Sequence, residues 1–179
     1  VRGDEMLAMG DCAINIDYQD TVDKATGEVT FSAAQKLAEA LETAKTAETF
    51  GIDPKVAMLS FSTKGSGKGG TVALSHDATV IAKELAPELK LDGEMQFDAA
   101  VSPVVGQLKF PGSPVAGHAN TFIFPCIEPA TSAIRSRSVW AALRHGPILQ
   151  GLNAPINDLS RGCDAEEVYQ MSIITAALA

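Results

Sequence analysis

The sequence has few cysteines, no long apolar run and no excess of basic residues. Its three cysteines, Cys12, Cys126 and Cys163, are odd in number and widely spaced, so we expect reduced thiols, with neither a disulfide framework nor a zinc site. No apolar run approaches the ~20 residues that span a bilayer, and no basic segment followed by a long apolar one marks a secretion signal. We therefore expect a cytoplasmic protein with no membrane partner.

The charge balance argues against another class of partner. The chain carries 14 Lys and Arg residues against 22 Asp and Glu residues, which gives a formal net charge of −8 at pH 7. A surface that binds nucleic acid has to be basic, because it meets a phosphate backbone. Nucleic acid is therefore not expected as a partner, whereas a small anion held by a few local donors is compatible with this composition.

The composition that is present is typical of a folded protein. Of the 179 residues, 46% are hydrophobic and 20% are charged, which argues against disorder. This length suffices for one domain with a sizeable core, or for one domain and a piece of another. The chain lacks an initiator Met and its first apolar run begins almost at once, at Met6, so we expect a fragment of a longer protein.

Short apolar runs alternate with longer amphipathic ones. The nearly continuous apolar run over residues 55–61 predicts a buried parallel strand, and residues 6–16 and 120–125 are expected to hold two more. A helix is expected over residues 31–50, ended by Gly51. Its common apolar face contains Phe31, Ala34, Leu37, Ala38, Leu41 and Ala44.

The remaining segments complete an alternating pattern. Residues 17–30 are polar and turn-rich, which predicts a surface loop or a short hairpin. We expect a helix over 71–86, a strand piece and an interrupted helix over 91–110, a helix over 131–145 with Trp140 in the core, and a loop and strand over 146–157. The core positions expected for the helix over 71–86 are Val72, Val80, Ile81 and Leu85. This alternation predicts an α/β fold with three layers (αβα) and a largely parallel sheet.

The loop "SFSTKGSGKGG" follows an expected strand and precedes an expected helix. Ligands of parallel sheets bind at the carboxyl ends of strands, and helix N-termini attract anions. The loop is rich in glycine and adds hydroxyl donors and a cation. We therefore take it as a candidate substrate-binding loop, and the alternative is a surface loop without a ligand. The candidate residues are Ser62, Thr63, Lys64, Gly65 and Ser66.

The glycine pattern of this loop does not by itself specify a cofactor. Gly65, Gly67 and Gly70 formally fit G-x-G-x-x-G, but no clear strand ending in Asp or Glu follows about 20 residues later. The loop is not a P-loop either, because Thr71 follows Gly70 where a lysine is needed.

A second candidate lies near the end of the chain, in "NDLSRGCDAEE". Arg161 offers a planar fork of donors for phosphate, Ser160 a hydroxyl, and Gly162 room for close backbone approach. The spacing of Asp164 and Glu167 also predicts a capping box at the start of a helix. On spacing alone, Glu167 is more readily a cap residue than a catalytic one.

Other reactive side chains have ordinary interpretations. Cys163 stands at an expected helix N-terminus, where a thiol can become reactive, but a small packing residue is the more common case. His76, His118 and His145 are far apart in the sequence and lack metal-ligand spacing, so no metal site is expected.

Five segments, taken together and in order, resemble the C-terminal half of the phosphate acetyltransferase (phosphotransacetylase) family. They are "KVAMLSFSTKGSG", "DGEMQFDAAVSPVV", "SPVAGHANTFIFP", "GPILQGLNAPINDLSRGC" and "IITAALA". The resemblance runs along nearly the whole chain and is weakest at "DYQDTVDKATGEVTFS", which looks like a small insertion.

The resemblance implies a function and a domain organisation. The family interconverts acetyl-CoA and phosphate with CoA and acetyl phosphate, and its fold is similar to that of isocitrate and isopropylmalate dehydrogenases. Residues 1–153 are then expected to form the second α/β domain. Residues 154–179 are expected to return, as a strand and a helix, to a first domain whose main part is upstream. A homodimer is expected, and the fragment alone should be inactive.

The resemblance also assigns roles to the second candidate segment. Ser160 is implied to stabilise the reacting acetyl and thiolate groups, and Arg161 to bind CoA or phosphate. Seven residues after this serine the family has an aspartate that takes the proton of the CoA thiol, and here Glu167 occupies that position. The family's phosphate-binding arginines are expected in the missing half. No metal or organic cofactor is implied, because CoA is a substrate.

Three other functions are compatible with parts of this pattern. A phosphate butyryltransferase would carry out the same chemistry on a longer acyl group. A non-catalytic acetyl-CoA-binding domain, as in the tails of some malic enzymes, would tend to lose the Ser-Arg pair that this chain keeps. A nicotinamide dehydrogenase is suggested by the glycine-rich loop, but the missing acidic partner argues against it.

Overall fold

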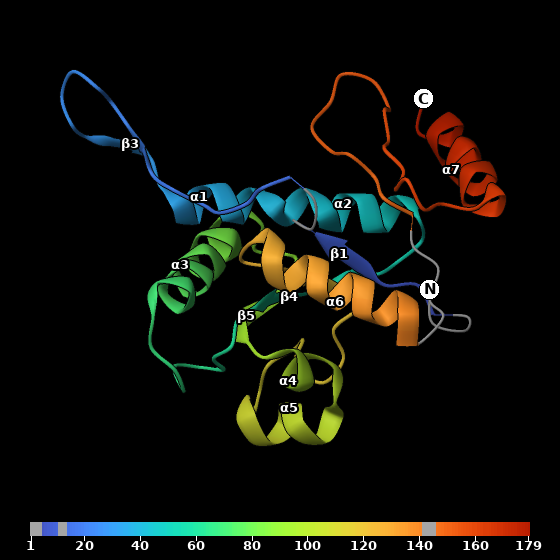
Figure 1. The fold of residues 1–179 in the computed structure, drawn as a ribbon. Helices are drawn as coiled ribbons and strands as arrows, with labels where there is room; N and C mark the ends of the chain where they lie inside the picture. Colours follow the sequence, from blue (N-terminus) through green and yellow to red (C-terminus); the bar gives the residue numbers. More distant parts are fainter. Residues whose placement is uncertain (1–4, 11–13, 141–145) are drawn as a thin grey trace.

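A four-stranded parallel sheet lies at the centre of the computed structural model, which describes residues 5–10, 14–140 and 146–179 and the side chains of all of these except 137–140 (Figure 1). The strand order is β1-β6-β4-β5, and each neighbouring pair runs parallel. The strands are β1 (Ala8–Gly10), β4 (Lys55–Leu59), β5 (Lys90–Met95) and β6 (Thr121–Ile123).

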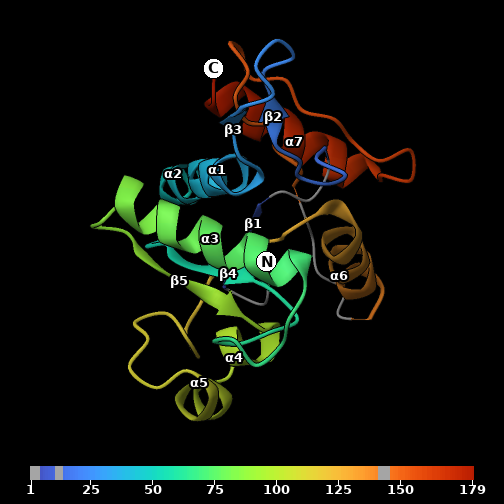
Figure 2. The same cartoon turned by 90° about the vertical axis from the view of Figure 1, so that its left-hand side faces the viewer.

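Helices cover both faces of the sheet, as the alternating sequence pattern predicts (Figures 1 and 2). One face packs against α1 (Ala33–Ala38), α2 (Glu42–Thr49) and α3 (Gly70–Leu85), with the 3-10 turn η1 (Glu39–Leu41) joining α1 to α2. The other face packs against α4 (Phe97–Val101) and α6 (Ile127–Trp140), and α5 (Pro103–Lys109) packs on α4. The last helix is α7 (Ala165–Ala177).

The alternation of side chains along β4 explains why there are two apolar layers. Successive side chains of a strand point to opposite faces of a sheet. Val56 and Met58 accordingly join the core under α1, α2 and α3, whereas Ala57 and Leu59 join the core under α4 and α6. All four side chains are buried, so β4 is apolar at every position after Lys55. The three-layer α/β prediction is confirmed.

Local signals place the helix boundaries. Ser32 caps α1 in a capping box with Gln35, and Gly51, with φ at +77°, follows the end of α2. The helix predicted over 31–50 is therefore confirmed as the run from α1 to α2, with a 3-10 turn in its middle.

The core face of α3 differs from the prediction at two positions. Val80 and Leu85 are exposed, at 47% and 64% of their surface, whereas Val72 is buried as expected. The packed face instead carries the small residues Ala78 and Ala82. Small side chains let a helix lie close to a sheet. Here the buried face of α3 follows this close packing and not the most hydrophobic side chains.

Residues 17–30 contain the start of a short hairpin, one of the two predicted alternatives. Strands β2 (Thr21–Val22) and β3 (Val29–Phe31) pair antiparallel and project away from the three layers (Figure 1). The carboxylate of Asp23 accepts hydrogen bonds from the amides of Ala25 and Thr26, at 2.7 and 3.0 Å. This turn is a local construction that needs no contact with the core.

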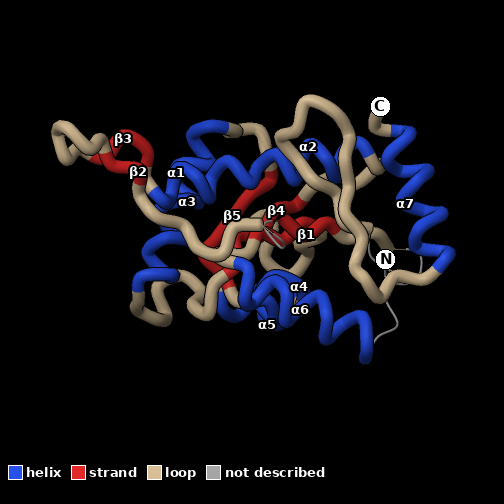
Figure 3. The backbone as a smooth tube through the Cα atoms, turned by 45° about the horizontal axis from the view of Figure 1, so that its top comes forward, coloured by secondary structure: helices blue, strands red, loops and turns tan. Residues whose placement is uncertain are grey.

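The strand predicted within residues 146–157 is wrong for this structure. Residues 146–164 form loops and turns (Figure 3). A strand requires a neighbouring strand to hydrogen-bond with, and Pro155 and Gly151 weaken this segment further. The side chain of Trp140, and Cys12 and His145, lie outside the described residues.

Candidate functional site

The glycine-rich loop joins β4 to α3 at the carboxyl ends of the parallel strands. The Ser62 side chain is fully buried, donates to Glu94 Oε1 at 3.0 Å and accepts from the Gly67 amide at 3.0 Å. Thr63 Oγ1 accepts from the Gln96 amide at 2.9 Å. These two hydroxyl groups are therefore engaged in holding the loop against β5.

The backbone of the loop turns around Glu94. Lys64 and Gly65 adopt the left-handed region, with φ at +49° and +77°. The Lys64 amide donates to the carbonyl oxygen of Glu94 at 3.1 Å, and the Gly65 amide donates to Glu94 Oε1 at 2.7 Å. The pattern expected to cradle an external anion thus encloses a carboxylate of the protein itself.

Glu94 is a functional candidate that sequence reasoning missed. Its side chain is 2% exposed, and His76 Nδ1 lies 3.2 Å from Oε2. Burial alone would raise the pKa of this carboxyl group, but hydrogen bonds from Gly65, Ser62 and His76 together hold the pKa of Glu94 below its ordinary value. The available signal was an acidic residue near the end of an expected strand, which Asp92 on the same strand shares.

The outer side of the loop carries the groups that a ligand could reach. Lys64, Gly65 and Ser66 are exposed, as is Lys68. Lys64 Nζ lies 5.1 Å from the centroid of the Phe110 ring, a cation–π contact. Of the five candidate residues, Ser62 and Thr63 are buried, whereas Lys64, Gly65 and Ser66 are exposed. Ser66 also helps to shape the loop, because its Oγ accepts from the Thr63 amide at 3.0 Å.

The second candidate segment forms a tight turn before α7. Ser160 and Arg161 are both exposed, and the Cys163 amide donates to the Ser160 carbonyl oxygen at 3.0 Å. The Gly162 amide lies 3.4 Å from Ser160 Oγ. Cys163 is a half-buried free thiol. Ser160 and Arg161, two of the three side chains to which the resemblance gives a role, are thus accessible.

The start of α7 forms the capping box that the sequence predicts. Glu167 is the third residue of the helix, and its Oε2 accepts from the Asp164 amide at 3.0 Å. Asp164 Oδ1 accepts in return from the Glu167 amide at 2.8 Å. One oxygen of the Glu167 carboxylate is thus used within the first turn of the helix.

Asn157, at the start of the "NDLSRG" segment, connects this region to α7. Its Oδ1 accepts from the Leu149 amide at 3.0 Å, and its Nδ2 donates to Thr175 Oγ1 at 2.8 Å. Gln150, one residue after Leu149, donates to the Glu42 carbonyl oxygen at 3.1 Å and so ties the same loop to α2. These hydrogen bonds therefore connect the segment before the Ser160 turn to α7 and to α2.

The structure does not bring the two candidate segments together. In Figures 1 and 2, α7 and the turn before it lie beyond α1 and α2, whereas the glycine-rich loop lies at the end near α4. Within the described part of the chain, these are two separate sets of residues.

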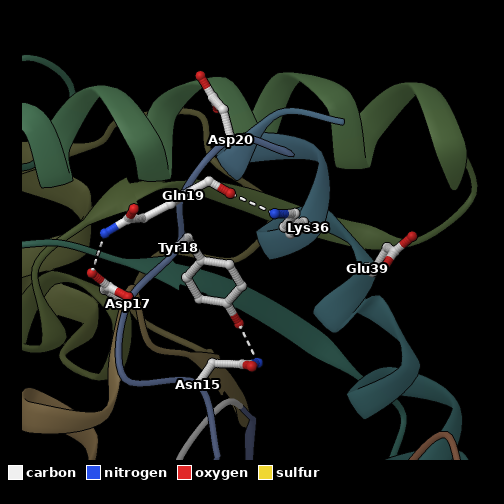
Figure 4. A pocket seen from close by; sticks show the side chains of 7 residues that line it. All are labelled: Asn15, Asp17, Tyr18, Gln19, Asp20, Lys36 and Glu39. Atoms are coloured by element: carbon white, nitrogen blue, oxygen red, sulfur yellow. Dashed lines mark hydrogen bonds between the residues drawn. The ribbon is translucent and has the colours of Figure 1, made fainter. Parts of the chain in front are cut away.

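A hollow lies between residues 14–20 and the helical segment from α1 to η1 (Figure 4). Its polar groups mostly bind one another: Gln19 donates to Asp17 at 2.9 Å, and Asn15 donates to the Tyr18 hydroxyl at 3.0 Å. The lining contains three carboxylates and one ammonium group, from Lys36. This balance is unsuited to an anionic ligand such as phosphate or CoA.

Two features are absent from the described residues. No group of three or more His, Cys, Asp or Glu side chains among them could hold a metal ion. None of the described helices combines the length and the apolar character needed to cross a bilayer.

Comparison with known protein families gives a match over almost the whole chain. Residues 1–176 match the family model described as phosphate acetyl/butaryl transferase. The chain is 50% identical to the phosphate acetyltransferase of Bacillus subtilis, covering 99% of this chain and 51% of that protein. It is 46% identical to the phosphate acetyltransferase of Staphylococcus epidermidis, covering 100% of this chain and 52% of that protein. The chain thus spans about half the length of the curated relatives it matches.

Solved structures agree with this similarity. A phosphotransacetylase from Streptococcus pyogenes superimposes with a TM-score of 0.85 at 49% identity, covering 98% of this chain and 50% of that one. The EutD phosphotransacetylase from Staphylococcus aureus gives 0.83 at 46% identity, covering 99% and 51%. A branched-chain phosphotransacylase from Enterococcus faecalis gives 0.70 at 23% identity, covering 95% and 58%, and this shows a shared fold alone.

Proposed function

The chain belongs to the phosphate acetyl/butaryl transferase family, and we propose that the protein containing it is a phosphate acetyltransferase. The reaction is the reversible conversion of acetyl-CoA and phosphate to CoA and acetyl phosphate. The observation that carries this proposal is the 50% identity to a phosphate acetyltransferase along 99% of the chain.

Half of the enzyme is expected from outside this chain. The chain covers 51% of its Bacillus subtilis relative, and the four strands of its central sheet that the structure describes end at residue 123. We propose that residues 1–153 form the second domain and that residues 154–179 cross to a first domain, which carries the arginines that bind phosphate. The separation of the two candidate segments in Figure 2 supports this division.

Arg161 and Ser160 are proposed to act on the substrates directly. The exposed guanidinium of Arg161 can bind a phosphate group with two parallel hydrogen bonds. The exposed hydroxyl of Ser160 can donate to the oxyanion that develops on the acetyl carbonyl. Donors of this type are worth on the order of 3–4 kcal/mol of transition-state stabilisation.

Glu167 is proposed as the general base. A free thiol has a pKa of about 8.5, so a carboxylate that removes its proton increases the amount of reactive thiolate. The thiolate then attacks the acetyl carbonyl carbon of acetyl phosphate, the C–O bond to phosphate breaks, and phosphate leaves. The cap engages Glu167 Oε2, and a carboxylate has a second oxygen that can accept the proton. No metal or organic cofactor takes part in this scheme.

The glycine-rich loop is proposed to contact CoA. Lys64, Gly65 and Ser66 face solvent at the carboxyl ends of the strands, and a lysine is suited to a phosphate of the nucleotide. Ser62 and Thr63 would contribute by shaping the loop, since their hydroxyl groups are already engaged. Further proposals are a homodimer, a cytoplasmic location and a role in acetate metabolism.

The experiment uses the full-length protein with acetyl phosphate and CoA, and follows thioester absorbance without added metal. Formation of acetyl-CoA is the expected result. Butyryl phosphate is the competing substrate, because the family description includes both acyl groups. A folded full-length protein that turns over butyryl phosphate but not acetyl phosphate would replace the proposal by phosphate butyryltransferase.

The isolated 179-residue chain is a second test of the domain proposal. We expect little or no turnover from it, because the phosphate-binding arginines would be missing. Full activity of the chain alone would contradict the division into two domains.

A further inference from the structure

Glu94 is a buried carboxylate that the proposed reaction does not use. Its side chain is 2% exposed, and no Lys or Arg within the described residues forms an ion pair with it. The groups around it are instead hydrogen-bond donors: Ser62 Oγ and the Gly65 amide on Oε1, and His76 on Oε2. A buried charge is costly unless it is well hydrogen-bonded, so this arrangement calls for an explanation.

A bulge in β5 places Glu94 in this position. In the pairing of β4 with β5, Met58 lies opposite Gly93 and Leu59 lies opposite Met95, so Glu94 is an extra residue in a bulge. Leu91 belongs to the core under α3, whereas Met95 belongs to the core under α4. Two residues four apart in a regular strand would face the same side of the sheet. The bulge therefore reverses the alternation, and the Glu94 side chain contacts the loop.

The carboxylate takes the place that an external anion would have. The Gly65 amide and the Ser62 hydroxyl both donate to Glu94 Oε1, and the Gly67 amide donates to Ser62 Oγ behind it. These inward donors are used, and a second anion beside them would meet the charge of Glu94. Contact with a substrate phosphate is left to the outward side chains of the loop, Lys64 and Ser66.

We infer that Glu94 is a positioning residue that holds the glycine-rich loop in the form that presents Lys64, Gly65 and Ser66 to CoA. This inference rests on the proposed function for its substrate, and on the contacts of Glu94 for the loop. Lys64 has φ at +49°, a backbone conformation that non-glycine residues adopt at a cost. The Lys64 amide bonds the backbone carbonyl oxygen of Glu94, and the Gly65 amide bonds its carboxylate. The second bond, with that from Ser62, is the part of this support that depends on the Glu94 side chain.

The test compares E94A and E94Q with D92N in the full-length protein. Asp92 is a suitable control, because it is another buried acid on β5 but pairs with Lys83 of α3, at 2.7 Å, and not with the loop. The kinetic readout is KM for CoA, KM for acetyl phosphate and kcat. The structural readout is the rate of trypsin cleavage after Lys64 and Lys68, which does not depend on activity.

For E94A we expect KM for CoA to rise about tenfold or more, the scale that follows from losing hydrogen bonds to a buried charge, together with faster cleavage in the loop. KM for acetyl phosphate should change by less than about threefold, because we propose that its phosphate is bound by arginines of the first domain. E94Q keeps one acceptor but turns an amide toward a donor, so its effects should be smaller and in the same direction. D92N should match wild type in KM for CoA and in loop cleavage.

Two outcomes separate this inference from the proposed function. If wild type does not form acetyl-CoA, the proposed function fails, and the cleavage rates still decide whether Glu94 holds the loop. A folded E94A protein with wild-type KM for CoA overturns the positioning role, and wild-type cleavage overturns the structural part as well. If E94A does not fold, E94Q is compared in the same way, and wild-type values for both readouts overturn the inference.

Discussion

Asp164 and Glu167 cap α7 reciprocally. Each carboxylate accepts the backbone amide hydrogen of the other residue, at 3.0 Å for the Asp164 amide and 2.8 Å for the Glu167 amide. The same Glu167 is the residue that we propose as the base of the acyl transfer. Capping and catalysis therefore compete for one side chain, and the two roles predict different results for two substitutions.

Glu167→Gln should separate the roles. If Glu167 is the base, this change should lower kcat by roughly 10²-fold or more and remove the acidic limb of the pH–rate profile. Glutamine is also accepted at this position of a capping box, so thermal stability should stay close to wild type. The measurements are steady-state kinetics across pH and a thermal melt of the full-length protein.

Asp164→Ala is the matched control on the same helical turn. It removes the N-cap and should cost about 1 kcal/mol of stability. A variant with Glu167→Gln that keeps wild-type turnover and pH profile would leave the residue with a capping role alone. Ser160 and Arg161 would then be the remaining residues of the proposed site.

Arg161→Lys is expected to behave as a severe substitution although it conserves the charge. Lysine cannot supply the planar, two-pronged donor set of a guanidinium, so KM for CoA or phosphate should rise by about tenfold. Arg135→Lys is the control, because Arg135 is an exposed arginine on α6, outside the proposed site. Wild-type kinetics in the Arg161 variant would contradict its proposed role in binding CoA or phosphate.

The hydrogen bond between Asn157 and Thr175 should support the turn that carries Ser160. Asn157→Ala removes both of its bonds, to Leu149 and to Thr175, and is expected to cost about 1–3 kcal/mol. Trypsin cleavage after Arg161 should become faster as the support is lost. Asn157→Ala and Thr175→Val both remove the bond between the two side chains, so their effects should not add fully. Additive effects would show that this bond does not couple the segments.

Local sequence signals predicted much of the fold. The apolar run of β4, the capping box of α7 and the glycine after α2 each depend on residues close together in the chain, and the structure has all three. The exposed face of α3 was not predictable in this way. Ala78 and Ala82 form its buried face because the helix packs closely on the sheet, and this packing involves residues distant in the chain.

The candidate site was less predictable, because its decisive contacts join distant residues. Glu94 lies 32 residues from Ser62 and reaches it only because β4 and β5 run parallel and a bulge interrupts their pairing. The same limit applies to residues 146–157, where an apolar pattern suggested a strand but the described residues form loops and turns. A hydrophobic pattern indicates which residues prefer burial, but the secondary structure that they adopt also depends on the strand or helix that they pack against.

The low pKa of Glu94 leads to a prediction on acid stability. Although burial opposes ionisation, the donors from Gly65, Ser62 and His76 favour the charged form, so the folded-state pKa lies below the unfolded value. Between these values the unfolded state binds more protons, and stability therefore rises with pH. The stabilisation by Glu94 should be fully present above about pH 4.5, near the unfolded pKa, and should be lost as the pH falls through the folded pKa.

Glu94→Gln cannot ionise, so its melting temperature should lie below that of wild type at pH 7, with a difference that shrinks on acidification. Asp98→Asn is the control, because Lys109 also lowers the pKa of Asp98, but this carboxylate is exposed and its contribution is screened by solvent. Melts of the full-length variants from pH 7 down to about pH 3 measure the difference. A gap between wild type and Glu94→Gln that stays constant over this range would show that ionisation of Glu94 does not stabilise the fold.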